Sequence, residues 1–233
     1  MRKRSVITPV CSGLAILAGS FSFMGAAQSV TLLSENFEGS VNVFAAPTYN
    51  YSLNYTLPNS LAPGGGLSYM HGGPGTSGAA SSKIFTATGS PINLLTGGIT
   101  GGQIDGGLIT YNLYAQVSTY LGQNDNATLF VQFLKVDNSP LGAALQIGGA
   151  AFVGALGGGT GSRDWGADSL AGFVPSGARS ASVLLFETKT ANGSNIDGYV
   201  DNVTFSIAVV PEPGAMTLLA LGGGLAALAR RRF

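Results

Sequence analysis

Residues 48–57 read TYNYSLNYTL, so tyrosine or leucine stands at every second position, with threonine, asparagine or serine between them. This period of two residues predicts a strand with one buried face, because successive side chains of a strand point to opposite sides. Tyr49, Tyr51 and Tyr55 then share a face with two leucines. That grouping favours a place in the core over an exposed surface for stacking sugars.

Other parts of the chain between its two ends have the same character. Runs rich in Val, Ile, Leu, Tyr and Phe are separated by clusters of glycine, asparagine and serine, and none has an amphipathic helical period. Several short strands joined by such turns indicate an antiparallel β-sandwich. The runs are residues 108–117, 128–136, 180–187 and 198–207, and two of the longest turns are residues 97–107 and 154–161.

Composition narrows the class of protein further. Hydrophobic residues make up 45% of the 233 residues and charged residues only 9%, which argues against an intrinsically disordered chain. Between residues 28 and 208, five basic residues stand against ten acidic ones, a net charge of −5. Because phosphate neutralisation dominates nucleic-acid affinity, a nucleic-acid partner is excluded.

The first 27 residues have the pattern of a secretory signal peptide. Residues 2–4 are basic, an apolar stretch around residues 14–18 follows, and small residues end at Ala27. We expect cleavage after Ala27, because the apolar run is too interrupted for the alternative, an uncleaved anchor helix. Cys11 would leave with the peptide, so the mature chain has no thiol and no disulfide.

The last residues combine three features in order. Pro211, Glu212 and Pro213 precede sixteen uncharged residues, 214–229, which are followed by Arg230, Arg231 and Arg232. As a helix, sixteen residues span about 24 Å, which is short of the ~30 Å hydrocarbon core of a bilayer. The arginines are expected to stay on the cytoplasmic side.

This arrangement resembles the PEP-CTERM sorting signal of Gram-negative bacteria. The resemblance implies recognition by an exosortase, removal of the tail, and release of the body to the cell surface or the exopolysaccharide matrix, after a transient stay in the inner membrane. The alternative is a simple tail anchor that contains Pro-Glu-Pro by chance. The chain would then consist of a signal peptide (1–27), a β-sandwich (28–208) and a sorting tail (209–233), with helices in the first and last parts.

Two short motifs at opposite ends of the central part bear on its topology. Residues 36–38 read NFE near its start, and residues 198–203 read GYVDNV near its end. This pair resembles the jelly-roll sandwiches of carbohydrate-binding modules and galactose-binding-like domains. In such modules the corresponding acids often share a structural calcium, so the resemblance implies Glu38 and Asp201 as ligands. The alternative is that both acids cap turns or face solvent.

Catalytic motifs are largely missing. His71, the single histidine, lies in a glycine-rich stretch that is similar to the oxyanion loop of some hydrolases, but no GxSxG elbow accompanies it, and we expect a loop residue without a catalytic role. A pair of carboxylates could still form a glycosidase, with Asp164 and Asp168 as acids to test. Trp165, in a polar stretch, is the candidate for an exposed glycan contact. The sequence therefore predicts an exported, non-catalytic surface or matrix protein that binds glycans, with an extracellular hydrolase as the alternative.

Overall fold

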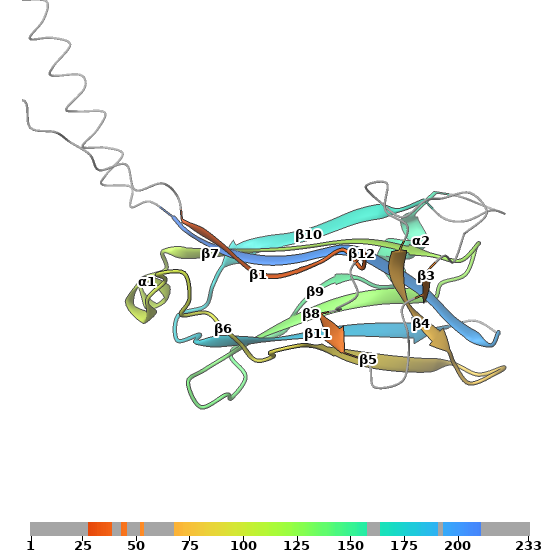
Figure 1. The fold of residues 1–233 in the computed structure, drawn as a ribbon, viewed down its shortest axis with the longest axis horizontal. Helices are drawn as coiled ribbons and strands as arrows, with labels where there is room; N and C mark the ends of the chain where they lie inside the picture. Colours follow the sequence, from red (N-terminus) through yellow and green to blue (C-terminus); the bar gives the residue numbers. More distant parts are fainter. Residues whose placement is uncertain are drawn as a thin grey trace, which may run out of the picture.

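The computed structural model describes residues 28–38, 43–45, 52–53, 68–157, 164–190 and 193–210. In these ranges the chain forms two antiparallel sheets that face each other, with short helices at their margins (Figure 1). The elements in chain order are β1 (Ser29–Glu35), β2 (Phe44–Ala45), β3 (Ser52–Leu53), β4 (Ser68–Pro74), β5 (Ser81–Ala87), β6 (Ile92–Asn93), α1 (Gly101–Asp105), β7 (Ile109–Thr119), β8 (Asn126–Leu134), β9 (Leu145–Gly148), α2 (Ala150–Ala155), β10 (Gly166–Phe173), β11 (Ser180–Lys189) and β12 (Asn195–Val209).

We call the two layers sheet I and sheet II. Sheet I has the strand order β10-β7-β12-β4-β3, with β1 also paired to β12, and sheet II has the order β2-β5-β11-β8-β9, with β6 also paired to β11. Successive strands change layer repeatedly, as from β4 to β5, from β7 to β8 and from β11 to β12. The prediction of an antiparallel jelly-roll sandwich is confirmed, and the four apolar runs named above correspond to β7, β8, β11 and β12.

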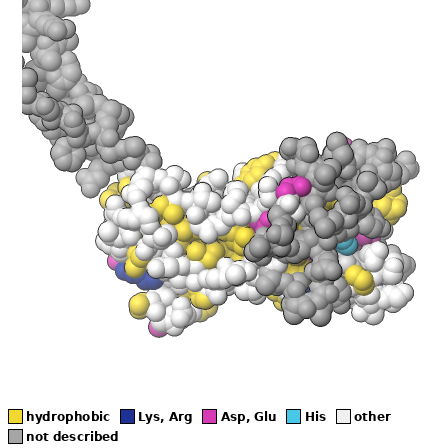
Figure 2. All heavy atoms as spheres, viewed as in Figure 1, with side chains coloured by type: hydrophobic (Ala, Val, Ile, Leu, Met, Phe, Trp, Pro, Cys, Tyr) yellow, Lys and Arg dark blue, Asp and Glu magenta, His cyan; other side chains and the backbone are white. Residues whose placement is uncertain are grey.

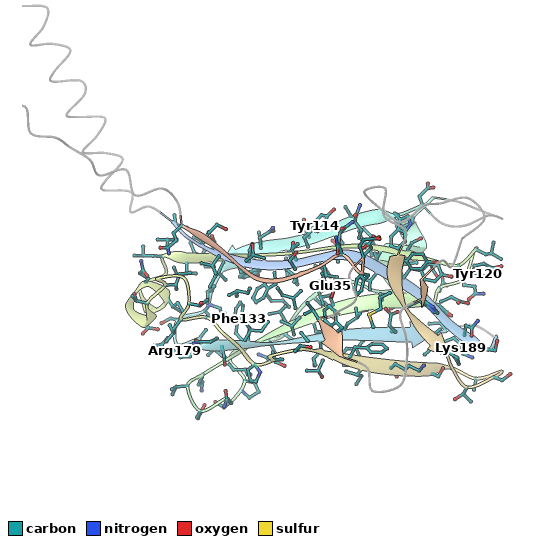
Figure 3. All side chains as sticks on the ribbon, viewed as in Figure 1. Glu35, Tyr114, Tyr120, Phe133, Arg179 and Lys189 are labelled. Carbon is teal, nitrogen blue, oxygen red and sulfur yellow. The ribbon has the colours of Figure 1, made fainter. Side chains whose placement is uncertain are left out.

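The core lies between the sheets, where alternate residues of each strand meet. In β11, Ala181, Val183 and Leu185 are fully buried while their neighbours are half-exposed, which is the period of two that the sequence shows. From β8, Phe133 lies 6.3 Å from the ring centre of Phe205 in β12 (Figure 3). Each large apolar side chain buried in this way stabilises the fold by about 1.5–3 kcal/mol.

Two short helices occur where turns were predicted. Helix α1 lies inside the turn predicted at 97–107, and α2 ends in the turn predicted at 154–161. In α1 the Gln103 amide donates to the Thr100 hydroxyl, and the Thr100 amide donates to the Gln103 side chain at 2.8 Å, so a capping box starts the helix. Helices of five or six residues are too short to show an amphipathic period, so the sequence reading missed them.

Some predictions lie outside the described residues. These are the signal peptide at 1–27, the Tyr49, Tyr51 and Tyr55 face, and the tail from residue 211 with its helix. Of the strand predicted at 48–57, residues 52 and 53 form β3, which pairs with β4. In the part of the chain that the structure describes, no helix has the length and hydropathy to cross a membrane.

Candidate functional site

A groove of about 430 Å³ lies on the outer face of sheet II, on the side away from the core. It is built by the outward-pointing residues of β8 and β11, which alternate with the buried residues that fill the sandwich. The β8–β9 connection adds one wall through Ala144. The lining residues are Phe130, Gln132, Leu134, Ala144, Ser182, Leu184 and Phe186.

Two phenylalanines form the apolar part of this groove. The rings of Phe130 and Phe186 meet edge to face, with their centres 4.8 Å apart. In the strand register Phe186 stands opposite Ile84 of β5, which is 58% exposed. Neighbouring side chains on one face of a sheet interact in this way, and here they form an apolar strip that crosses three strands.

Uncharged polar groups lie beside the aromatic pair. The Gln132 amide nitrogen donates to the carbonyl oxygens of Phe133 at 2.9 Å and Leu141 at 3.2 Å, which fixes the orientation of the side chain. Ser182 accepts a hydrogen bond from the Ser90 hydroxyl at 3.2 Å, so its own hydroxyl hydrogen remains available for a ligand. The lining contains no acid, base or thiol. The groove can therefore bind a neutral molecule with both apolar and hydroxyl surface.

Trp165 lies elsewhere, in an aromatic cluster on sheet I. Its ring contacts Tyr69 edge to face at 5.5 Å and lies 6.5 Å from Tyr199, and both tyrosines are almost fully buried. Trp165 itself is half-buried, and its Nε1 is a buried donor without a hydrogen-bond partner in the described residues. The structure thus gives Trp165 less exposed surface than its polar sequence neighbours indicated. Its role as a glycan contact stays a prediction.

The acids predicted to hold calcium lie close together. The pairing of β12 with β7 shifts register after Asp201, and Asn202 has a φ of +49°. The Asp201 side chain at this irregularity is buried. Burial raises the pKa of Asp201 to about 7, and the nearby carboxylates of Glu38 and Glu35 add to that rise, although the amide of Asn202 donates to Asp201 at 2.7 Å. Asp201 is therefore within electrostatic range of both Glu38 and Glu35.

Glu35 already has partners within this acidic group. Its Oε1 accepts from the Phe37 amide at 2.7 Å, and its Oε2 accepts from the Val43 amide at 2.5 Å. Residues 39–42, which link these two amides in sequence, lie outside the described residues. Among the residues that are described, no three His, Cys, Asp or Glu side chains are arranged to hold a metal ion. Further ligands to an ion at Glu38 and Asp201 would have to come from carbonyl or amide oxygens.

A second polar group lies inside the sandwich, at the end of β11, and the sequence analysis did not single it out. Glu187 and Lys189 continue the buried row of that strand. Lys189 Nζ donates to the carbonyls of Thr76 at 2.5 Å and Gly193 at 2.8 Å, which ties two hairpins together (Figure 3). The described residues provide no hydrogen-bond partner for either carboxylate oxygen of Glu187. Burial, and then the charge of Asp125, raises the pKa of Glu187 well above its ordinary value.

Asp125 is the neighbour that organises this interior group. It is fully buried, its Oδ1 accepts from the Thr190 amide at 2.7 Å, and its Oδ2 accepts from the Asp197 amide at 3.2 Å. Burial, together with Asp125, raises the pKa of Asp197 to about 6, and Lys189 opposes that rise. Because Asp125 and Glu187 have no exposed surface, this pair is inaccessible to a polysaccharide and serves the structure.

His71 lies in strand β4, opposite Tyr199 of β12, so the prediction of a loop residue was wrong. The glycine-rich sequence suggested a loop, but the backbone pairs with the central strand. Its Nδ1 accepts from the Gly73 amide at 3.0 Å, and burial followed by the charge of Lys83 lowers its pKa.

The two acids named for a test of hydrolysis are in different settings. Asp164 is exposed. Asp168 accepts from the amides of Gly148 and Ser169, each at 2.8 Å, so each of its carboxylate oxygens already has a partner. Asp168 thereby links the edge strands β10 and β9 of the two sheets. These contacts give Asp168 a structural role.

The chain is similar to several solved structures and, at its C-terminus, to one family model. No curated protein sequence matches the chain. Among solved structures, the CBM22-1 xylan-binding domain of Paenibacillus barcinonensis Xyn10C is similar at 15% identity and a TM-score of 0.39, covering 80% of this chain and 99% of that one. Caldicellulosiruptor saccharolyticus CBM27-1, solved with mannohexaose, gives 18% identity and a TM-score of 0.38, with coverage of 80% and 99%.

A third structure, a family 16 carbohydrate-binding module, gives 17% identity and a TM-score of 0.32 and covers 61% of this chain and 78% of its own. A family model also matches the C-terminal part of the chain, beginning at Val209, the last residue of β12. Residues 209–232 match the PEP-CTERM protein-sorting motif, which indicates an exported protein that an exosortase processes at the membrane.

Proposed function

We propose that this chain is an exported, non-catalytic glycan-binding protein of a Gram-negative cell surface or exopolysaccharide matrix, and that it binds polysaccharide on the outer face of sheet II. The observation that carries the proposal is the hollowed, uncharged surface around Phe130 and Phe186. The opening NFE and closing GYVDNV motifs, which resemble carbohydrate-binding modules, support the same function.

The chemistry of the groove suits a sugar chain. Sugar rings present C–H faces that pack on apolar and aromatic surface, while their hydroxyls need donors and acceptors at the rim. Phe130 and Phe186 supply the aromatic surface, and Gln132 and Ser182 supply hydrogen-bonding groups. A groove without charges favours a neutral polysaccharide over a polyuronate, because a carboxylated chain would lose hydration without gaining a partner.

The absence of carboxylates from the groove lining supports binding without hydrolysis. Glycoside hydrolysis needs two carboxyl groups about 5 to 9.5 Å apart, flanking the bond to be cleaved. The acids that the described residues bring together at Asp125 and Glu187 are buried inside the sandwich. A carboxylate-dependent glycan hydrolase, the alternative function, would therefore need a site other than this groove.

We also propose a structural calcium ion at Glu38 and Asp201. The buried Asp201 carboxylate, with two further acids near it, is a concentration of negative charge that a hard cation would neutralise. Bound there, the ion would tie the end of the opening strand to the middle of the last one. Its contribution is to stability, since the site is distinct from the glycan groove.

Processing completes the proposal. Signal peptidase would remove residues 1–27, and the exosortase would recognise Pro211, Glu212 and Pro213 while the apolar segment holds the chain in the inner membrane. Arg230, Arg231 and Arg232 would act as the cytoplasmic stop. The body, freed from this tail, would join the matrix together with its polysaccharide.

Affinity electrophoresis of the purified body in gels that contain single polysaccharides tests the binding function. A panel of neutral and uronic-acid glycans should include one neutral glycan that retards the protein. The double variant F130A/F186A should weaken that binding by tenfold or more, which corresponds to about 1.4 kcal/mol. Tyr114→Ala is the matched control, because Tyr114 is a half-exposed aromatic residue of β7 in sheet I (Figure 3).

Trp165→Ala provides the third arm of this experiment. If Trp165→Ala abolishes the retardation while F130A/F186A leaves it intact, Trp165 is the glycan contact, as the sequence analysis predicts, and the site lies on sheet I. If no glycan of the panel retards the protein, the proposed glycan binding is wrong. Release of reducing sugar with turnover, abolished by one acid substitution such as Asp164→Asn, would establish the hydrolase instead.

A further inference from the structure

The two ends of the described chain leave the sandwich side by side. Strand β1 pairs antiparallel with β12, so that Ser29 stands opposite Ala208. The Val209 amide donates to the carbonyl of Gln28 at 2.9 Å, and the Val210 amide donates to the carbonyl of Leu108 at 2.7 Å. The residues that follow the signal peptide and those that precede the sorting motif therefore meet at one end of the molecule (Figure 1), which we call the terminal end.

Backbone contacts define what else lies at the terminal end. The Val174 amide donates to Ile109, the residue after Leu108, which places the end of β10 there. The Leu94 amide donates to the carbonyl of Arg179, and the Arg179 amide donates to the carbonyl of Leu134, where β8 ends. The loop after β6, the turn after β10 and the turn after β8 are thus neighbours.

Most of the exposed large apolar side chains lie in or directly beside these three segments. Of the four large hydrophobic residues exposed in the described part of the chain, Leu95 (41%) and Val136 (85%) lie in turns of the terminal end, and Phe173 (62%) is the last residue of β10 at the same end. Ile84 lies within β5, on the face of sheet II. Isolated exposed apolar residues are ordinary on a soluble protein. Three at one end of the molecule, beside the membrane-targeted segments, call for a partner.

Charge at the terminal end is balanced. Arg179 forms a salt bridge with Asp105 at 2.7 Å, and Lys135 lies two residues from Asp137 in the turn after β8. At this end Figure 2 shows a basic patch with acidic atoms near it and separate groups of hydrophobic atoms. A surface with equal numbers of both charges is neither drawn to anionic lipid nor repelled by it, so apolar contact determines its affinity for a bilayer.

The tether between the body and the membrane segment is short. Val210 is held by the body, and the uncharged segment starts at Gly214, four residues later. Four residues reach at most about 14 Å when fully extended. The polar layer on each side of a bilayer is roughly 5–8 Å thick, as the difference between the total and the hydrocarbon thickness gives. With the segment in the bilayer, the terminal end cannot stand clear of the lipid surface by more than about 6–9 Å.

We propose that the terminal end is a lipid-contacting surface, on which Leu95, Val136 and Phe173 rest against the membrane interface while the sorting tail is attached. The partner is the lipid surface itself. This proposal rests on the tail being in the membrane and is independent of glycan binding. The long axis of the sandwich then stands away from the membrane, with the β11–β12 hairpin at its far end.

Two exposed serines provide a matched pair of reporters. Ser176 lies in the turn after β10 at the terminal end, and Ser194 lies in the β11–β12 hairpin at the opposite end. In the full chain with Cys11→Ser, a cysteine at one of these positions is labelled with an environment-sensitive fluorophore. The protein is reconstituted into phosphatidylcholine vesicles in which part of the lipid carries a quencher at the headgroup.

Lipid quenching should be strong at position 176 and near zero at position 194. The variant L95S/V136S/F173S should lower the quenching at position 176 at least twofold while the chain still sediments with the vesicles, and salt should leave it unchanged. Equal, weak quenching at both positions in sedimenting protein would overturn the lipid contact alone. If the chain stays in the supernatant, membrane attachment by the tail and the lipid contact both fail.

Discussion

Replacing Glu187 by methionine should stabilise the protein. The Glu187 carboxyl is fully buried, and neither of its oxygens has a hydrogen-bond partner among the described residues. Leaving a buried polar group unsatisfied costs about 1–3 kcal/mol. Methionine has a similar length and no such requirement, so we expect Glu187→Met to raise the free energy of unfolding by ~2 kcal/mol at pH 7. For a domain of this size that corresponds to a melting temperature higher by about 4–8 °C.

The stabilisation that Glu187→Met provides should increase with pH. Because the pKa of Glu187 is raised in the folded state, the folded protein holds this proton more tightly than the unfolded chain does. The wild-type stability linked to Glu187 is therefore fully present below the ordinary carboxyl pKa and is lost as pH rises through the folded pKa. The advantage of Glu187→Met must grow from pH 5 to pH 8.5, which urea titrations followed by tryptophan fluorescence would measure.

Glu35 offers a control of the same residue type. It is also buried, but its two oxygens accept from the amides of Phe37 and Val43. Glu35→Met would leave both amides unpaired and should destabilise the protein by roughly 3–6 kcal/mol, since hydrogen bonds to charged groups contribute about 1.5–3 kcal/mol each. The same substitution at the two glutamates thus has opposite signs. A destabilising Glu187→Met, or a gain that is constant across pH, would refute this account of the buried carboxyl.

Three further outcomes are expected. A chelator should lower the melting temperature by several degrees, because an ion at a hundredfold excess over its dissociation constant stabilises the folded state by about 2.7 kcal/mol. Asp201→Asn should remove this response to the chelator. An unchanged melting curve of the wild-type protein in chelator would exclude the ion. Phe133→Ala should lower the free energy of unfolding, measured by urea titration, by about 3–5 kcal/mol, since it empties the space between Tyr111 and Phe205. A loss below ~1 kcal/mol would show that the core can collapse around the missing side chain. Mass spectrometry of the native protein should find neither residues 1–27 nor the three terminal arginines, and recovery of the intact chain from membranes of a host with its exosortase would contradict the processing scheme.

The sheets were predictable because their pattern is local. A period of two residues marks β7, β8, β11 and β12 without knowledge of their partners. The strand predicted at 180–187 ends at Glu187. Continuing the same alternation for two more residues predicts that Lys189 is buried as well, so Lys189 could have been identified from the sequence.

The groove was not predictable in the same way. Phe130 and Phe133 both lie in β8, yet one faces the groove and the other the core. The alternation of residues shows which side chains share a face of the strand. When both faces carry phenylalanine, however, the alternation does not show which face packs in the core. Trp165 shows the same limit, because the tyrosines that half-bury it are distant in sequence. Contacts between distant segments decide both cases.

The place of β12 in sheet I has a consequence for the order of events during export. Of the strands in the described residues, β12 is the last to be synthesised, yet it lies at the centre of its sheet and pairs with β7, β4 and β1. Strand β1 has to wait for a partner that is about 180 residues away, and pairings so distant in sequence form slowly. Until residues 195–209 emerge, sheet I lacks the strand that joins its two halves. The chain can therefore be threaded across the membrane before a stable barrier to translocation exists, and the sheet closes only when the sorting motif itself arrives.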